Sequence, residues 1–243
     1  MPLTFAHPAV IIPFKYIPPK YYSWTGLIAG TLAPDFEAFI KLGGYKQFSH
    51  SWVGMLLFDL PVGVALTFLF HLVVRDALVQ QLPSFLSNRL RAFSINWINT
   101  FRQRYGVIIL SSLIGIFTHL VWDRLTHTDS YSYHKKAGIQ IAPDVETTLR
   151  QWLQWSNSII GLLIIIWQIY LLPVSKPKPL YCWKYYWIVV ALTPIPLLAF
   201  RTQFYHEGDD LINTTIAGVL YGIILASLIF QKKSRQKNIL TAP

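Results

Sequence analysis

Long apolar segments constrain this chain more than any other feature. A helix needs about 20 apolar residues to cross a bilayer, and five segments reach or nearly reach that length. Only 13% of the residues are charged, whereas a soluble domain carries about 25%. The sequence therefore predicts an all-α, polytopic helical membrane protein with about five or six membrane-embedded helices. The apolar segments are residues 51–74, 105–126, 156–174, 185–200 (short, with two internal prolines) and 214–230.

A sixth, weaker apolar segment spans residues 21–40, "YYSWTGLIAGTLAPDFEAFI". Pro34, Asp35 and Glu37 interrupt it, so it can cross the bilayer, re-enter from one face or lie at the interface. These alternatives place the N-terminal segment differently. A full crossing puts His7 on the cytoplasmic side, whereas re-entry lets His7 join residues at the outer face.

The net charge of +10 lies in the gaps between the apolar segments. Loop charges that face anionic lipid explain it better than nucleic-acid binding, and we expect no nucleic-acid partner. The basic loops 75–104 and 175–184, and the tail after residue 230, fall on one side when five crossings follow residue 51. We therefore predict a multi-pass protein of the inner (plasma) membrane with a cytoplasmic C-terminus. Regions 41–50, 127–155 and 201–213 are then outside.

We predict a single membrane domain, residues 1–243. Residues 1–127 carry the notable motifs, and residues 128–243 add further membrane helices and the basic tail. A single cysteine, Cys182, excludes an intrachain disulfide and a thiolate metal cluster. The N-terminus lacks a leading basic region and contains prolines, so we expect no cleavable signal peptide. The oligomeric state is left open.

The stretch "THLVWDRLTH", residues 118–127, places His119, Asp123 and His127 at positions i, i+4 and i+8. These positions differ by only about 40° and 80° around a helix, so the three side chains share one face. Ionisable groups inside a membrane are costly and usually mark a functional site. A His–Asp pair at this spacing can also simply form a hydrogen bond, so the stretch alone leaves both interpretations open.

Other ionisable residues fall on the same predicted outer side. Histidine nitrogens and carboxylate oxygens suit zinc, manganese or iron, and a bound metal lowers the pKa of water far enough for hydrolysis. Asp59, next to Pro61, is either a partner of a helix kink or a hydrogen-bond acceptor for a ligand histidine. Glu37 is either solvated or a general base, and His71 is best explained as an interfacial anchor. The residues on the outer side are Asp35, Glu37, His50, His206 and Asp210, with Asp59 deeper in the membrane.

Several motifs resemble an uncharacterised bacterial membrane family, the DUF4184 proteins. They are "FAHPAVIIPF", "AGTLAPDFEAFI", "SHSWVGMLLFDLPVGV" and "IGIFTHLVWDRLTH", and the match covers most of residues 1–127. That family is in turn similar to the YdjM-type inner-membrane proteins, which are described as predicted metal-dependent hydrolases. The resemblance implies a fold and a site more than an activity.

The order of candidate ligands is also similar to that of the zinc-dependent phospholipase C and S1/P1 nuclease group. Those are soluble all-helical enzymes with several zinc ions, in which a further His-x-x-x-Glu follows; here His206-x-x-x-Asp210 is the nearest equivalent. This chain lacks the amino-terminal Trp ligand and is embedded in lipid, so phosphodiester chemistry is an analogy. The resemblance favours the re-entrant arrangement, in which the ligands are His7, Asp35, His50, His119, Asp123 and His127.

We therefore expect a metal site, most favourably for Zn²⁺, with Mn²⁺ or Fe²⁺ as alternatives. Asp59, His206 and Asp210 are additional candidate ligands, and Asp35 or Glu37 is the candidate proton acceptor. The expected function is metal-dependent hydrolysis of a phosphoester or ester of a lipid or envelope component. The alternative is a non-enzymatic transporter or scaffold with a structural polar cluster. Ligand atoms of one zinc ion should lie about 3–4 Å apart, and scatter beyond about 8 Å would remove the site.

Overall fold

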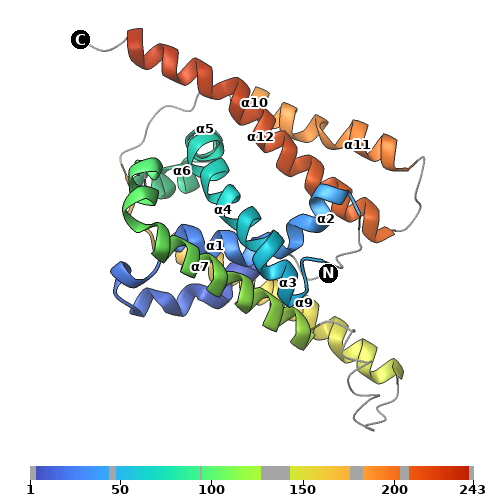
Figure 1. Ribbon diagram of the computed structural model, residues 1–243. Helices are drawn as coiled ribbons and strands as arrows, with labels where there is room; N and C mark the ends of the chain where they lie inside the picture. The colour runs from blue at the N-terminus through green and yellow to red at the C-terminus, as the bar shows by residue number, and fades with distance from the viewer. Residues whose placement is uncertain are drawn as a thin grey trace. The chain divides into compact units, whose positions relative to one another are not determined.

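The computed structural model describes residues 4–43, 48–93, 95–126, 143–175, 183–202 and 208–240 (Figure 1). Within these residues the chain is helical and forms no β-strand, which confirms the all-α class. Four helices are long and apolar enough to cross a membrane, which confirms a polytopic membrane protein. These spans are Trp52–Gln81, Trp97–Leu125, Gln151–Tyr170 and Leu211–Phe230.

The two weaker segments do not form single long helices. Residues 185–200 are divided at Thr193 into α10 (Trp183–Leu192) and α11 (Pro194–Arg201), and a proline at the start of α11 suits this position because it has no N–H to leave unpaired. The sixth segment contributes α1 (Trp24–Leu32), which at 1.5 Å per residue is roughly 14 Å long. That length is about half of the hydrocarbon core, so α1 by itself does not cross it.

The chain forms two compact units, each assembled from three segments. Unit 1 contains Met1–Asp35, Phe48–Val64 and Arg104–Gln168. Unit 2 contains Phe36–Gln47, Ala65–Gln103 and Ile169–Pro243. The single membrane domain expected from the sequence stays a prediction.

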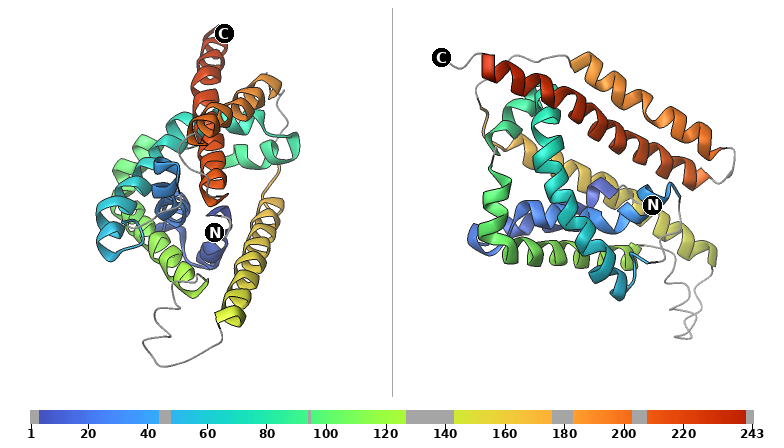
Figure 2. Two further views of the ribbon diagram at one scale, coloured as in Figure 1. Left: turned by 90° about the vertical axis from the view of Figure 1, so that its right-hand side faces the viewer. Right: turned by 45° about the horizontal axis from the view of Figure 1, so that its top comes forward.

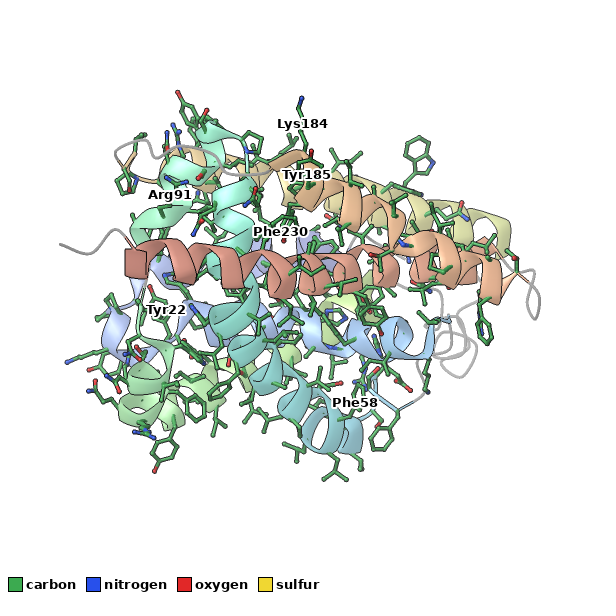
Figure 3. All side chains as sticks on the ribbon, turned by 90° about the horizontal axis from the view of Figure 1, so that it is seen from above. Tyr22, Phe58, Arg91, Lys184, Tyr185 and Phe230 are labelled. Atoms are coloured by element: carbon green, nitrogen blue, oxygen red, sulfur yellow. The ribbon has the colours of Figure 1, made fainter. Side chains whose placement is uncertain are left out.

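In unit 1 the N-terminal segment folds back on α1. A 3-10 helix, Thr4–Tyr16, packs on α1 through an apolar cluster of Ile11, Tyr22 and Leu27 (Tyr22 is labelled in Figure 3). The Arg104 guanidinium donates hydrogen bonds to main-chain carbonyls in the connection, including that of Tyr22. These contacts hold the N-terminal segment beside α1.

Close helix packing sets the position of α1 in unit 1. Gly26 and Gly30 of α1 lie one turn apart and face α7 (Trp97–Thr126). A Cβ atom on Gly30 would lie only 2.2 Å from the carbonyl oxygen of Ser112, and one on Gly115 would lie 2.3 Å from the carbonyl oxygen of Leu27. Small residues at such contacts allow two membrane helices to approach closely. Glycine therefore fixes the distance between α1 and α7.

The first span, Trp52–Gln81, contains two wide turns of π type. The first, Met55–Asp59, precedes Pro61, which lacks the N–H for an ordinary helical bond and crowds the carbonyl one turn earlier. The wide turn accommodates this by bonding the Leu60 N–H to the Met55 carbonyl. Such turns are frequent at functional sites. The span comprises α3 (Trp52–Gly54), Met55–Asp59, α4 (Leu60–Leu69), the second wide turn Phe70–Val74 and α5 (Arg75–Gln81).

Unit 2 is built around the long helix α12 (Gly208–Leu240), with α10 and α11 alongside it (Figure 2). Tyr186 of α10 is fully buried there, and its hydroxyl lies 3.1 Å from the Ser227 hydroxyl of α12. The remaining helices of the described chain are α2 (Phe36–Lys41), α6 (Ser84–Leu90) and α9 (Pro143–Tyr170), with short 3-10 turns at Pro19–Tyr21, Ala33–Asp35 and Arg91–Phe93.

Candidate metal centre

Four predicted ligands come together in unit 1. His119 and Asp123 lie one turn apart near the end of α7, His50 precedes α3, and Asp35 ends the 3-10 turn after α1. Each side chain offers a nitrogen or oxygen atom, and these atoms all lie within 4.8 Å of one another. The spread is well below the 8 Å limit set above. The four residues form a largely buried group that could hold a metal ion.

The carboxylate of Asp123 is the centre of this group. Its Oδ2 lies 3.0 Å from Nε2 of His50 and 3.3 Å from Nε2 of His119. Its Oδ1 lies 3.2 Å from Nε2 of His7, which brings the N-terminal histidine to the same carboxylate. Asp35 adds a second carboxylate, with Oδ1 3.7 Å from Nε2 of His119. Three imidazole rings therefore present the same nitrogen, Nε2, to one carboxylate.

The other ring nitrogens are held by oxygen atoms. Nδ1 of His119 donates to the Thr31 carbonyl at 2.7 Å, and Nδ1 of His7 donates to the Thr4 carbonyl at 3.2 Å. A carbonyl only accepts hydrogen bonds, so both Nδ1 atoms carry a proton. Nδ1 of His50 lies 2.9 Å from the Ser49 hydroxyl, which can donate or accept. Such oxygen partners fix the orientation of metal-binding histidines.

This arrangement has an electrostatic consequence. In a neutral ring with a proton on Nδ1, a lone pair occupies Nε2. That lone pair would face the negative oxygens of Asp123, which repel it. The arrangement is favourable only when a proton or a cation lies between nitrogen and carboxylate. The donor set therefore fits a divalent cation, which can satisfy several nitrogens and two carboxylates together.

His7 shows the same preference for positive charge. Burial of the ring opposes its protonation, but the hydrogen bond to Asp123 and the attraction of Asp123 and Asp35 outweigh burial. The pKa of His7 is therefore raised above its usual value of 6.5. The ring of His7 also stacks on His119, with centroids 4.1 Å apart and planes inclined by 18°. The N-terminal 3-10 helix thus places the His7 ring against the His119 ring of the group.

Residues that the sequence did not single out complete the group. The Thr4 hydroxyl donates to Oδ2 of Asp35, which leaves Oδ1 facing His119. Thr4 and His7 are three residues apart, a spacing that puts side chains on one face of a 3-10 helix, so this signal was present in the sequence. The contact of Ser49 with His50 joins neighbouring residues and has no periodic signature.

Access to the group differs among its members. The side chains of His119 and Asp35 are 0% and 2% exposed, whereas that of His50 is 24% exposed. A small molecule approaching from outside therefore meets His50 first among these three. A structural polar cluster would be expected to close over all of its members.

Other candidate residues lie elsewhere. Asp59 is buried in the Met55–Asp59 turn of unit 1 and does not belong to the four-residue group. Glu37 belongs to unit 2, at the start of α2, where its carboxylate forms an ion pair with Lys41. His71, also in unit 2, stacks on Trp97 with centroids 4.3 Å apart. Outside the described parts lie His127 and His206, and of Asp210 only the helical backbone is described.

The fold and this group define a polytopic helical membrane protein with a buried His–Asp cluster suited to a metal ion. The chain matches the family model "Domain of unknown function (DUF4184)" over residues 1–230, and it belongs to that family. This confirms the resemblance drawn from the motifs of residues 1–127. No curated protein and no solved structure matches the chain. The relationships to YdjM-type proteins and to the phospholipase C and nuclease group stay predictions.

Proposed function

We propose that this protein is a membrane-bound, metal-dependent hydrolase that cleaves a phosphoester or other ester of a lipid or envelope component. One observation carries the proposal: three histidines present Nε2 to the carboxylate of Asp123, and two of them donate Nδ1 to main-chain carbonyls. Ionisable groups in the membrane segments of a protein are energetically costly and usually mark a functional site.

The residues divide into two roles. His50, His119, Asp35 and Asp123 would hold the ion, with Zn²⁺ favoured by the mixed nitrogen and oxygen donors and Mn²⁺ or Fe²⁺ as alternatives. A bound ion would supply Lewis acidity and a nucleophilic water at neutral pH. His7 orients Asp123 through the contact with Oδ1.

Asp35 is the proposed proton acceptor. Its carboxylate belongs to the buried group, where the attacking water would lie, so it could take a proton from that water. The water oxygen forms a bond to the acyl carbon or phosphorus, the ester C–O or P–O bond breaks, and the leaving alcohol receives the proton. Glu37 is the weaker candidate for this role because its carboxylate is already paired with Lys41.

The position along the helices supports a substrate at a membrane surface. His50 precedes the span Trp52–Gln81 by two residues, and Asp123 lies two residues before the end of the span Trp97–Leu125. The group is thus at one end of two membrane helices. We assign this end to the outer face of the plasma membrane, because the basic loops and tail belong on the cytoplasmic side.

This topology depends on α10 and α11. Together they cover Trp183–Arg201, which is roughly 28 Å at 1.5 Å per residue and long enough for a fifth crossing. A C-terminal green fluorescent protein fusion should then fluoresce, and a C-terminal alkaline phosphatase fusion should be inactive. Active phosphatase at the C-terminus would place the tail outside and remove the fifth crossing.

Metal analysis of the purified protein tests the function most directly. We expect about one divalent ion per chain, lost in Asp123→Asn because the central carboxylate is removed. His71→Gln is the matched control: it changes a histidine of a membrane span that is not a member of the group, and it should keep the ion. The same preparations are then screened against long-chain and short-chain esters and phosphoesters. Absence of metal from the wild-type protein, with hydrolysis unchanged in His119→Ala, would refute the proposal. Absence of metal with a lowered melting temperature of His119→Ala would leave a structural cluster in a transporter or scaffold.

A further inference from the structure

A mostly apolar, open pocket adjoins the metal-binding group in unit 1. It has a volume of about 250 Å³ and lies between the N-terminal 3-10 helix and α9. Figure 2 shows these two helices, blue and yellow, beside each other. Small and aliphatic side chains form its walls, among them Ala9 of the 3-10 helix and Ile160 and Ile164 of α9. Asn157 adds a polar group from α9.

One end of the pocket is shared with the metal-binding group. His7 lines the pocket, and Nε2 of the same ring lies 3.2 Å from Oδ1 of Asp123. Trp122, the residue before Asp123 on α7, is also part of the wall. A ligand that fills the pocket therefore ends beside the cluster.

The other boundary of the pocket faces lipid. Ile160 and Ile164 are 52% and 39% exposed, and both belong to the membrane span Gln151–Tyr170. In a bilayer, the medium around exposed side chains of such a span consists of acyl chains. The pocket lining thus includes lipid-facing side chains of α9 as well as His7, which contacts the His–Asp group.

We propose that this pocket seats one acyl chain of a membrane lipid and so places the ester or phosphoester of that lipid at the His–Asp group. The inference rests on the proposed hydrolase function and narrows its substrate to lipids with long acyl chains. Lipid tails are as apolar as the pocket, so entry gains little free energy. The pocket acts by positioning the scissile bond, not by tight binding.

Filling the pocket tests this assignment. Ile164→Trp places a bulky indole ring in the pocket. Ile166→Trp is the matched control, because Ile166 is an exposed residue of α9 that does not line the pocket. Both variants keep all the proposed metal ligands, so both should retain the wild-type metal content. Because misplacing a substrate by about 1 Å can cost about 100-fold in rate, Ile164→Trp should lower kcat/KM for long-chain lipid at least about tenfold. Hydrolysis of a short-chain, water-soluble ester or phosphoester should be unchanged in both.

A photo-crosslinking experiment gives a readout independent of hydrolysis. The full chain is placed in nanodiscs of phosphatidylethanolamine and phosphatidylglycerol, with some phosphatidylglycerol carrying a diazirine in one acyl chain. Mass spectrometry should locate labels on the N-terminal 3-10 helix together with the pocket face of α9. Ile164→Trp should reduce those labels severalfold, and Ile166→Trp should not.

The outcomes separate the two proposals. Labels spread evenly around α9, and equal in both variants, overturn the acyl-chain pocket while leaving a metal-dependent hydrolase intact. Equal loss of long-chain hydrolysis in both variants also overturns it. Labels concentrated in the pocket of a protein without metal support lipid binding there and refute the hydrolase instead.

Discussion

Replacing the central carboxylate, Asp123→Asn, is the most informative single perturbation of the cluster. Asparagine keeps the shape of the side chain but removes the charge that three histidine rings share. A hydrogen bond to a charged group contributes about 1.5–3 kcal/mol, and the rings of His7 and His50 form such bonds with the Asp123 carboxylate. The three contacts are 3.0–3.3 Å long, and they are not additive because they share one acceptor group.

The expected loss follows from these contacts. Breaking a buried ion pair by removing one partner costs about 3–5 kcal/mol of the free energy of unfolding. For a chain of this size, 1 kcal/mol shifts the melting temperature by about 2–4 °C, so the loss should be about 6–20 °C. Intrinsic fluorescence of the nine tryptophans in detergent reports the melting temperature. His71→Gln serves again as the control, because His71 is not a member of the cluster.

The effect should depend on pH, because His7 takes part as a protonated ring. The folded-state pKa of His7 is raised above 6.5, so its contribution is fully present below pH 6.5 and is lost as the pH rises through the raised value. In the presence of a chelator, the difference in melting temperature between wild type and Asp123→Asn should therefore be largest in mildly acidic buffer. It should shrink at alkaline pH.

Adding zinc should reverse this trend. Metal binding releases protons and therefore strengthens as the pH rises, so at alkaline pH zinc should stabilise the wild type and leave Asp123→Asn unchanged. Two results would refute the idea that histidine lone pairs face the Asp123 carboxylate. One is a melting-temperature difference between wild type and Asp123→Asn that grows with pH in the presence of a chelator. The other is stabilisation of both proteins by zinc to the same extent.

Three further predictions concern the packing and the metal. Gly30→Ala should lower the free energy of unfolding by about 1–3 kcal/mol and reduce bound metal, because its added Cβ would lie 2.2 Å from the Ser112 carbonyl oxygen. Gly106→Ala on α7 is the control: its added Cβ would meet no atom within 4 Å, so its melting temperature should equal or slightly exceed that of the wild type. Thr4→Val should weaken metal affinity about 10–100-fold in a zinc titration without abolishing it, because it releases Asp35 from its hydrogen bond; unchanged affinity would show that Thr4 does not orient Asp35. Zinc at 100 times its Kd should stabilise the wild type by about 2.7 kcal/mol, or roughly 5–11 °C, and absence of any shift would argue against binding to the folded state.

The membrane spans could be predicted because the signal for each is contained in its own residues. Length and hydropathy identified four spans that the structure confirms. The remaining segment, 185–200, is short and contains two prolines, and the structure divides it at Thr193. The wide turn at Met55–Asp59 was not predicted as such, although Pro61 marked a local irregularity. A hydropathy pattern reports that a helix exists but not how its internal hydrogen bonds shift.

The candidate site was predictable only in part from spacing. His119 and Asp123 share a helix face, and that follows from periodicity alone. His7, Asp35 and His50 lie on other segments, so only the family motifs indicated that they meet. The contact of Thr4 with Asp35 depends on the fold of the N-terminal segment, because the two residues are 31 positions apart and no periodic rule links them.

The interruption of the segment 21–40 explains how a polar cluster can be built next to apolar helices. Thr31 lies in the last turn of α1, where main-chain carbonyls lack regular intrahelical partners. The negative end of the helix dipole also lies there. The Thr31 carbonyl is the one that accepts Nδ1 of His119, and Asp35 follows four residues later. A continuous helix through this segment would use that carbonyl internally and would move Asp35 away from the group. The short α1, held against α7 by glycine contacts, therefore supplies both an acceptor and a carboxylate at the place where the cluster needs them.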